Sequence, residues 1–414
     1  MFASILLALA AAVGATQAPY SNPLNGTDTA IRLSADGRAK GVDVSKLPLV
    51  AKLPDENTSA VVPSERGKTE AGADASLDWI DGTTLPLEGK PYVEADTYYA
   101  RLPTSAKKDV VSGTWAMGHC TAGMSYVFKT TSRKLRVRWS LTSENLAMPH
   151  MAATGVSGVD LYAMTPEGWR FRKCGFPRKA RDNEFEIAVK PGGLYRLYLP
   201  LYNGIAELKF GVENGKTLTA VPLAAEKKPV VFYGGSVVQG ACVTRTGNAW
   251  VNIAGRDLDL PTVCMGFNGQ GRMILPEAGL LAKIDASCYA FLCLGNMVQK
   301  TYREDAEAFL RKLHGLKPDV PIVFGGYHYI LEPDNDRNAF AADLERKLKA
   351  EDTKFWANFL IVTTGAMCPA DIDGTVDGGH PNDYGARQMA AAFAAAVRAV
   401  LPACKGVGKM GTSK

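Results

Sequence analysis

The sequence predicts an all-β sandwich of the jelly-roll type followed by a doubly wound α/β domain with a mostly parallel sheet. Three observations predict this order. Short segments in which apolar and polar residues alternate fill the first half of the folded region, which is typical of half-buried antiparallel strands. Continuously apolar segments alternate with helical ones in the second half, which is typical of a parallel sheet covered on both faces. At 414 residues the chain is also long enough for two domains.

The N-terminal region has the composition of a targeting segment and a linker. Residues 1–18, MFASILLALAAAVGATQA, form an apolar run that ends in small residues, as in a secretory signal peptide. We therefore expect a secreted or periplasmic protein, with an uncleaved anchor as the alternative. Residues 19–75 are rich in Pro, Gly, Ser, Thr and acidic residues and are expected to be an extended or disordered linker. No later segment is apolar over about 18 residues, so we expect no membrane span in the mature chain.

Charge and cysteine content limit the classes of partner. The 47 basic residues exceed the 42 acidic ones by only five, and the two kinds are interspersed, which argues against nucleic-acid binding. The eight cysteines are compatible with export, but their spacing fits no zinc pattern. Cys288 and Cys293 lie on or beside one predicted strand and cannot easily pair with each other, so we expect some buried thiols.

Residues 76–228 are expected to form the β-sandwich. In KLRVRWSL (134–141), Leu, Val, Trp and Leu alternate with Lys, Arg, Arg and Ser, which predicts a strand with one buried face. The segments EFEIAVK, LYRLYLPLY and AELKFGVE repeat this alternation, and each is bounded by Gly, Pro or Asn. Several short strands separated by turn residues, with almost no helical period, predict two packed antiparallel sheets.

Residues 229–404 are expected to form the α/β domain, with residues 405–414 as a tail. The predicted strands are VVFYG, TVCMGF, YAFLCLG, PIVFGG and FLIVTT. The predicted helices include REDAEAFLRKLHGL, AFAADLERKLKA and ARQMAAAFAAAVRAVL. In doubly wound sheets, ligands bind beyond the carboxyl ends of the strands, so candidate site residues are sought there.

Ser236 lies just beyond the first of these strands, in GGSVVQG. A phosphate-binding P-loop would need a lysine after the last glycine, and none is present. The nucleophile elbow of α/β-hydrolases would need Gly-x-Ser-x-Gly, but Val238 occupies the last position. A serine nucleophile of another fold is left, and it needs a base, an orienting acid and oxyanion donors from elsewhere in the chain.

Residues suited to these roles follow the other predicted strands. Gly269 lies in the loop NGQG after the second strand, and Asn296 follows the third. After the last strand come Asp377 and His380, three residues apart. This spacing lets the carboxylate reach Nδ1 of the imidazole while Nε2 faces the serine. Asp377, His380 and Asp383 could instead hold a metal ion, which is the alternative for this segment.

The four blocks in this order resemble the SGNH (GDSL-type) hydrolase superfamily. The resemblance implies that Ser236 is the nucleophile and that His380 and Asp377 complete the catalytic triad. It also implies an oxyanion hole formed by Ser236, Gly269 and Asn296. The resemblance covers the whole α/β domain, so it predicts an SGNH or flavodoxin-like sheet. It calls for no metal or organic cofactor.

Two N-terminal motifs narrow the resemblance. SGVDLYAM (157–164) and YLPLYNG (198–204) resemble a bacterial GxDLY-type subgroup in which a jelly-roll domain precedes the hydrolase domain. Members of this subgroup are similar to carbohydrate acetylesterases. The chain departs from the Gly-Asp-Ser-Leu signature, since Gly235 stands in place of the Asp and Val237 in place of the Leu.

We therefore expect a secreted serine esterase that removes O-acetyl groups from carbohydrate through an acyl-serine intermediate. The alternatives are a short-chain lipase or thioesterase-like acyl hydrolase, and a carbohydrate-binding protein with an inactive hydrolase domain. His119 and His150 are expected to be structural or surface residues. Polar residues near the serine are expected to contact a sugar: Gln239, Thr244, Arg245, Asn248, Gln270 and Arg272.

Overall fold

The structure is a computed structural model, and it describes residues 76–221, 227–329, 336–368 and 372–401. The predicted signal peptide (1–18), linker (19–75) and tail (405–414) lie outside these residues. Within the described residues, no helix combines the length and apolar character needed to cross a membrane.

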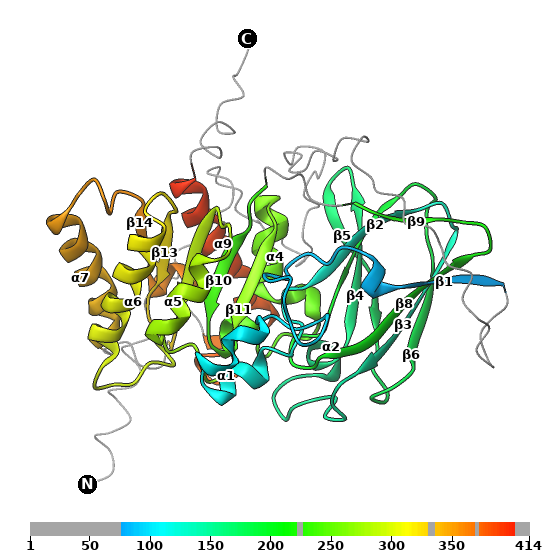
Figure 1. The fold of residues 1–414 in the computed structure, drawn as a ribbon, viewed down its shortest axis with the longest axis horizontal. Coiled ribbons are helices and arrows are strands. Elements are labelled where there is room, and N and C mark those ends of the chain that lie inside the picture. The colour runs from blue at the N-terminus through cyan, green and yellow to red at the C-terminus, as the bar shows by residue number, and fades with distance from the viewer. Residues whose placement is uncertain (1–75, 222–226, 330–335, 369–371, 402–414) are drawn as a thin grey trace, which may run out of the picture. The chain divides into compact units, whose positions relative to one another are not determined.

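Two antiparallel sheets form the N-terminal region (Figure 1). The first sheet contains, in order, β1 (Leu77–Asp81), β8 (Ile205–Glu213), β3 (Lys134–Leu141) and β6 (Asn183–Ala188). The second contains β5 (Gly168–Gly175), β4 (Val159–Thr165), β7 (Leu194–Tyr198), β2 (Ser125–Thr130) and β9 (Leu218–Ala220). The two sheets share one apolar core, to which β3 contributes Trp139, β8 Phe210 and β2 Phe128. The predicted sandwich is confirmed, and this strand order favours the predicted jelly-roll topology.

Strand β3 shows why these residues form a sheet with one buried face. Its Leu135, Val137 and Trp139 are fully buried in the core between the sheets. The alternating basic residues point the other way, where Arg136 and Arg138 form ion pairs with carboxylates of β6. The alternation read from the sequence is therefore the alternation of the two faces.

The C-terminal region is a five-stranded parallel sheet between two layers of helices (Figure 1). Its strands are, in order, β11 (Thr262–Gly266), β10 (Val230–Gly234), β12 (Cys288–Leu292), β13 (Ile322–Gly325) and β14 (Phe359–Val362). Helices α4 (Trp250–Leu258) and α9 (Asp383–Val400) pack on one face. Helices α5 (Leu275–Ala282), α6 (Tyr302–Leu316) and α7 (Asp336–Glu351) pack on the other. The short helices are α1 (Ser112–Met117), α2 (Ala153–Val156), α3 (Ser236–Gln239) and α8 (Thr364–Met367). The predicted doubly wound fold is confirmed.

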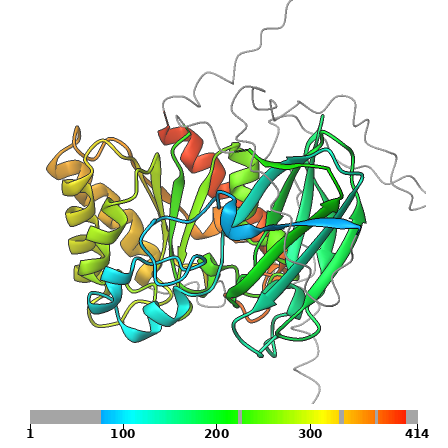
Figure 2. The same ribbon diagram turned by 45° about the vertical axis from the view of Figure 1, so that its right-hand side comes forward.

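One segment differs from the expectation of strands alone. Between β1 and β2 the chain forms a 3-10 turn (Thr104–Lys108) and helix α1, and this segment lies beside β11 and α5 in both views (Figures 1 and 2). Its Arg101 is fully buried and donates hydrogen bonds to the carbonyls of Cys264 and Gly266 at the end of β11. The N-terminal region thus supports the strand that leads into the loop of Gly269.

The cysteines of the described residues are all thiols. Seven of the eight are described, and each is free and buried. Burial raises the pKa of each thiol, to about 11 for Cys242 and Cys368. The expectation of buried thiols is confirmed for these seven, and a protonated thiol is a poor nucleophile.

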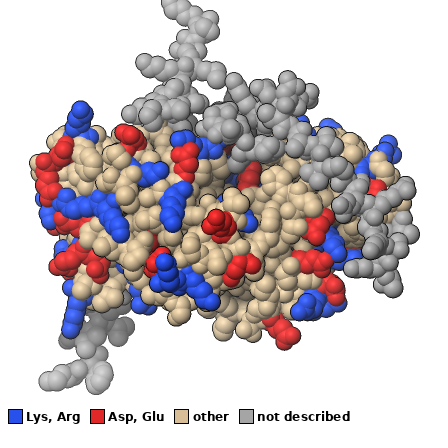
Figure 3. Space-filling model, in the orientation of Figure 1, with Lys and Arg blue, Asp and Glu red and all other residues tan. Residues whose placement is uncertain are grey.

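Charges of both signs are mixed on the surface. On the face drawn in Figure 3, basic and acidic side chains are interspersed. Several form ion pairs, as where Glu307 on α6 contacts both Arg311 and Lys347. The face drawn in Figure 3 therefore resembles an ordinary solvated surface more than a nucleic-acid binding one.

Candidate active site

The serine turn lies at the carboxyl edge of the parallel sheet. Strand β10 ends at Gly234, and Ser236 is the first residue of the one-turn helix α3, which Gly240 ends with φ 101°. Glycines are needed here because neighbouring chain segments lie too close to leave room for a side chain. A side chain at Gly235 would collide with the side chain of Asn296, and one at Gly271 with the backbone of Gly234 and Gly235. The turn can therefore be approached closely by the loops that follow β11 and β12.

Ser236, His380 and Asp377 form a continuous chain of hydrogen bonds. The Oγ atom of Ser236 lies 2.8 Å from Nε2 of His380, and Nδ1 of His380 lies 2.7 Å from Oδ2 of Asp377. The three residues come from the end of β10 and from the loop before α9. Ser236 is only 7% exposed, so little of the nucleophile candidate is open to solvent.

The protonation state of this chain follows from the surroundings of Asp377. Burial opposes ionisation, but the N–H groups of His380 and Gly379 and the imidazole of His380 bond to the carboxylate and hold the pKa of Asp377 below its ordinary value. An ionised Asp377 accepts a hydrogen bond from the N–H at Nδ1 of His380, and the proton stays on Nδ1. The Nε2 atom is then left with its lone pair directed at the hydroxyl of Ser236, which is the arrangement a general base needs.

Gly269 and Asn296 lie on the two loops next to the serine turn. Gly269 has φ 71°, in the left-handed region that favours glycine. Its loop is tied to α3 by a 2.8 Å hydrogen bond from the N–H of Asn268 to Oε1 of Gln239. Asn296 follows β12, and its side-chain amide lies against Gly235, the residue before Ser236. The structure brings both residues to the turn, and their oxyanion roles stay a prediction.

Asp383 does not join Asp377 and His380 in a cluster. Its carboxylate accepts hydrogen bonds from the N–H of Thr244 (2.9 Å) and from the hydroxyl of Thr244 (2.5 Å). Across the part of the chain that the structure describes, no group of three or more His, Cys, Asp or Glu residues could hold a metal ion. The three residues proposed as alternative metal ligands are thus used in two separate sets of contacts.

The polar residues expected to contact a sugar fall into two groups. Gln239 is fully buried, and its amide donates to the carbonyl of Leu201 and accepts from the N–H of Asn268. The prediction that Gln239 contacts a sugar is therefore wrong. Arg245 is engaged by Asp160. Arg272 is exposed, and Asn248 and Gln270 are partly exposed, so these side chains can meet a ligand.

Three further residues near the triad were not singled out in the sequence. The hydroxyl of Tyr202, from the sandwich, donates a 3.0 Å hydrogen bond to the carbonyl of Ser236. The ring of Tyr329 packs edge-on to His380 with centroids 6.3 Å apart. Burial lowers the pKa of His328 to about 3, so His328 is neutral. The sequence could have indicated Tyr329 and His328, because both lie in GYHY directly after β13, at the same edge of the sheet as Ser236.

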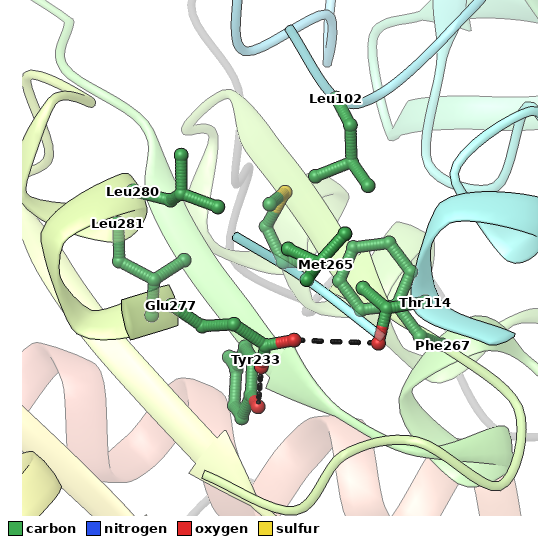
Figure 4. A pocket seen from close by; sticks show the side chains of 9 residues that line it. Leu102, Thr114, Tyr233, Met265, Phe267, Glu277, Leu280 and Leu281 are labelled. Atoms are coloured by element: carbon green, nitrogen blue, oxygen red, sulfur yellow. Dashed lines mark hydrogen bonds between the residues drawn. The ribbon is translucent and has the colours of Figure 1, made fainter. Parts of the chain in front are cut away.

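A buried carboxyl lies behind the serine strand (Figure 4). The side chain of Tyr233, three residues before Ser236, donates to Glu277 on α5, which also accepts from the hydroxyl of Thr114. The Tyr233 oxygen accepts from the N–H of Met273, in the loop after Gly269. Apolar side chains line the small cavity around this network, and burial raises the pKa of Glu277 to about 6.

Two family models match the chain. Residues 77–218 match the family model for the N-terminus of SGNH-hydrolase-type esterases, GxDLY. Residues 227–398 match the GDSL-like lipase/acylhydrolase family. The two matched segments together span about three quarters of the chain and cover both the sandwich and the α/β region. No curated protein sequence matches the chain.

Solved structures with the same fold cover most of the chain. A protein from Bacteroides ovatus described as a GDSL-like lipase is 24% identical, with a TM-score of 0.69 over 78% of this chain and 98% of its own. The salicylyl-acyltransferase SsfX3 from a tetracycline biosynthetic pathway is 16% identical, with a TM-score of 0.61 over 81% and 99%. A family two carbohydrate esterase from Cellvibrio japonicus is 11% identical, with a TM-score of 0.51 over 79% and 98%. The chain belongs to the SGNH (GDSL-type) hydrolases, a superfamily of ester-hydrolysing enzymes, in the subgroup whose hydrolase domain follows a GxDLY-type N-terminal domain.

Proposed function

We propose that the protein is a serine esterase in which Ser236 is the nucleophile, His380 the general base and acid, and Asp377 the residue that orients His380. The observation that carries the proposal is the hydrogen-bonded chain of these three side chains, with distances of 2.8 and 2.7 Å. An ester hydrolase of this kind needs a hydroxyl, a neutral imidazole and a buried or bonded carboxylate in this order.

The reaction would proceed in two steps. Nε2 of His380 takes the hydroxyl proton of Ser236 as Oγ attacks the ester carbonyl carbon. The tetrahedral intermediate collapses when the bond to the alcohol oxygen breaks, and the imidazolium gives its proton to that oxygen. A water molecule then attacks the acyl-serine while His380 takes its proton. The carboxylic acid leaves as His380 returns that proton to Oγ of Ser236.

The negative charge of the tetrahedral intermediate needs hydrogen-bond donors. We assign this role to the N–H groups of Ser236 and Gly269 and to the amide of Asn296. Three features support the assignment: Ser236 begins a helix, Gly269 has an open left-handed backbone, and Asn296 lies against the residue before Ser236. Donors held in place before the reaction are the ones that lower its barrier.

We propose acetyl groups on carbohydrate as the substrate. One support is physical. A long-chain lipase usually needs a mobile amphipathic helix that covers its acyl site. The apolar face of the amphipathic helix α6 instead packs against the sheet. The members of this face, Ala306, Phe309, Leu310 and Leu313, are all fully buried. A second support is the name of the neighbour from Cellvibrio japonicus, a carbohydrate esterase. The apolar run at residues 1–18 supports export to a compartment that contains polysaccharides.

Acyl chain length and polymer are tested together. Purified protein should hydrolyse p-nitrophenyl acetate faster than the butyrate and the octanoate, and it should release acetate from acetylated xylan. A rate that rises toward octanoate, without acetate release from any acetylated polysaccharide, would favour the lipase or thioesterase alternative. Retention on polysaccharide without hydrolysis of any ester would favour the binding-protein alternative.

A further inference from the structure

We propose that Asp160 of the sandwich is a positioning residue for the active site, which it reaches through residues 244–247 and the loop that carries His380. The inference deepens the proposed esterase function and rests on it. It gives a role to the aspartate of SGVDLYAM, a residue that does not contact the reacting atoms.

The first link joins the sandwich to the segment after the serine helix. Asp160 lies on β4 with a fully buried side chain, and its Oδ2 accepts hydrogen bonds of 2.8 Å from Nη1 of Arg245 and from the N–H of Gly247. The same Nη1 donates to the hydroxyl of Tyr162, and the guanidinium lies 4.0 Å from the ring centre of Phe171. Buried hydrogen bonds between charged groups hold their partners in one arrangement. If one partner moves away, the other is left as a buried charge without a counter-charge, which costs free energy.

The second link joins this segment to the histidine loop. Thr244, the neighbour of Arg245, donates from its N–H and from its hydroxyl to the two carboxylate oxygens of Asp383. Asp383 begins helix α9 and lies three residues after His380. From the other side, the hydroxyl of Thr154 on α2 of the sandwich donates to the carbonyl of Thr244. Residue 244 is therefore held by the sandwich and in turn holds the start of α9.

The histidine loop needs such support because it lies at the surface. The side chain of Asp377 is 50% exposed and that of His380 21% exposed. A misplacement of about 1 Å can cost on the order of 10²-fold in rate, so a modest loss of order in this loop should be visible in kcat.

Other contacts between the sandwich and the α/β region do not depend on Asp160. Arg101 bonds to the end of β11, and the guanidinium of Arg256 on α4 lies 5.4 Å from the ring centre of Tyr198 on β7 of the sandwich. Loss of the Asp160 charge should therefore leave both regions folded and packed while it loosens residues 244–247.

Two variants and one matched control test the proposal in the full chain. Asp160→Asn removes the charge of the first link. Thr244→Val removes the hydrogen bond from the Thr244 hydroxyl to Asp383. Thr244 is exposed, so this variant should fold even if Asp160→Asn does not. Glu186→Gln removes a carboxylate that forms ion pairs on the outer face of the same sandwich, away from residues 244–247.

The readouts are kcat and KM on p-nitrophenyl acetate and hydrogen–deuterium exchange of residues 376–385. We expect Asp160→Asn to lower kcat by about 10- to 100-fold and Thr244→Val by several-fold, with KM little changed, because both act on transition-state geometry. Exchange of 376–385 should become faster in both variants and stay unchanged in β13, and Glu186→Gln should match the wild type. An unchanged kcat with unchanged exchange would overturn the proposal. So would a loss of kcat accompanied by faster exchange throughout both regions, which indicates a merely structural role.

The two proposals fail in different ways. If the wild type hydrolyses no ester, the proposed esterase function is wrong, and the exchange of residues 376–385 alone decides on the positioning role. If the wild type is active and Ser236→Ala is not, the esterase function stands whatever the Asp160 variant does.

Discussion

Oγ of Ser236 and Nε2 of His380 lie within hydrogen-bond distance, 2.8 Å, although 144 residues separate them in the sequence. The parallel sheet brings them together, because it places the ends of β10 and of the segments after β14 at one edge. At this distance a proton can pass from the hydroxyl to the imidazole without a rearrangement of the site.

The carboxylate of Asp377 is predicted to be needed for rate and not for folding. Asp377→Asn replaces an oxygen that accepts from Nδ1 of His380 by an amide that favours the wrong tautomer. We expect kcat to fall by about 10⁴-fold, as in the Ser-His-Asp template, with an unchanged melting temperature within a few degrees. A fall of less than about tenfold would show that another group, such as Asp373, orients the imidazole.

Asn296 is predicted to act only in the transition state. Asn296→Ala should lower kcat by about 10²- to 10³-fold with little change in KM, the size of one lost oxyanion donor. The control is Asn145→Ala at an exposed position of the sandwich, where no effect on kcat is expected. A rise in KM with unchanged kcat would make Asn296 a substrate-binding residue instead.

Glu277 is predicted to make stability depend on pH. Burial raises its pKa from 4.5 to about 6 in the folded protein, so the folded state binds this proton more tightly than the unfolded state does. The stabilisation is present below about pH 4.5 and is lost as the pH rises through 6, which corresponds to about 2 kcal/mol. Glu277→Gln removes this dependence.

Urea unfolding at pH 4.5 and pH 7 measures the effect. The free energy of unfolding of Glu277→Gln, relative to wild type, should be about 2 kcal/mol more favourable to the folded state at pH 7 than at pH 4.5. Glu304→Gln, on the exposed face of α6, serves as the control. An equal difference at the two pH values would mean that Glu277 titrates as an ordinary carboxyl.

Chelation separates the serine mechanism from the metal alternative. The proposed serine mechanism uses a hydroxyl, an imidazole and a carboxylate and calls on no metal, so EDTA should leave the rate on p-nitrophenyl acetate unchanged. Inactivation by EDTA, followed by recovery on addition of Zn²⁺ or Mn²⁺, would point to a metal site that includes Asp377 or His380.

The fold could be predicted from two hydrophobic patterns, the alternating one and the continuous one, because each shows directly which faces of a strand are buried. The alternation in β3 and the unbroken apolar run of β10 each match the faces that the sheets bury. The segment around Arg101 could not be predicted in the same way. Its buried guanidinium bonds to carbonyls more than 160 residues away, and no local pattern announces such a long-range contact.

The candidate site was predictable where each residue follows a strand. Ser236, Asn296 and His380 all do, so the topology of a parallel sheet was enough to group them. Gln239 was misassigned because its polarity says nothing about burial, and its amide satisfies two buried backbone groups. The roles of Asp160 and Tyr202 depend on how the sandwich contacts the serine and histidine loops, which requires the three-dimensional structure.

The most direct test of the account is the chemistry of Ser236 itself. Wild-type protein treated with a serine-directed phosphonate should lose its esterase activity and carry one adduct, which peptide mass spectrometry should locate on Ser236. Ser236→Ala should retain its fold, since the change removes one oxygen, and should show neither hydrolysis of p-nitrophenyl acetate nor labelling. Full activity of Ser236→Ala, or an adduct on another residue, would contradict the assignment of the nucleophile.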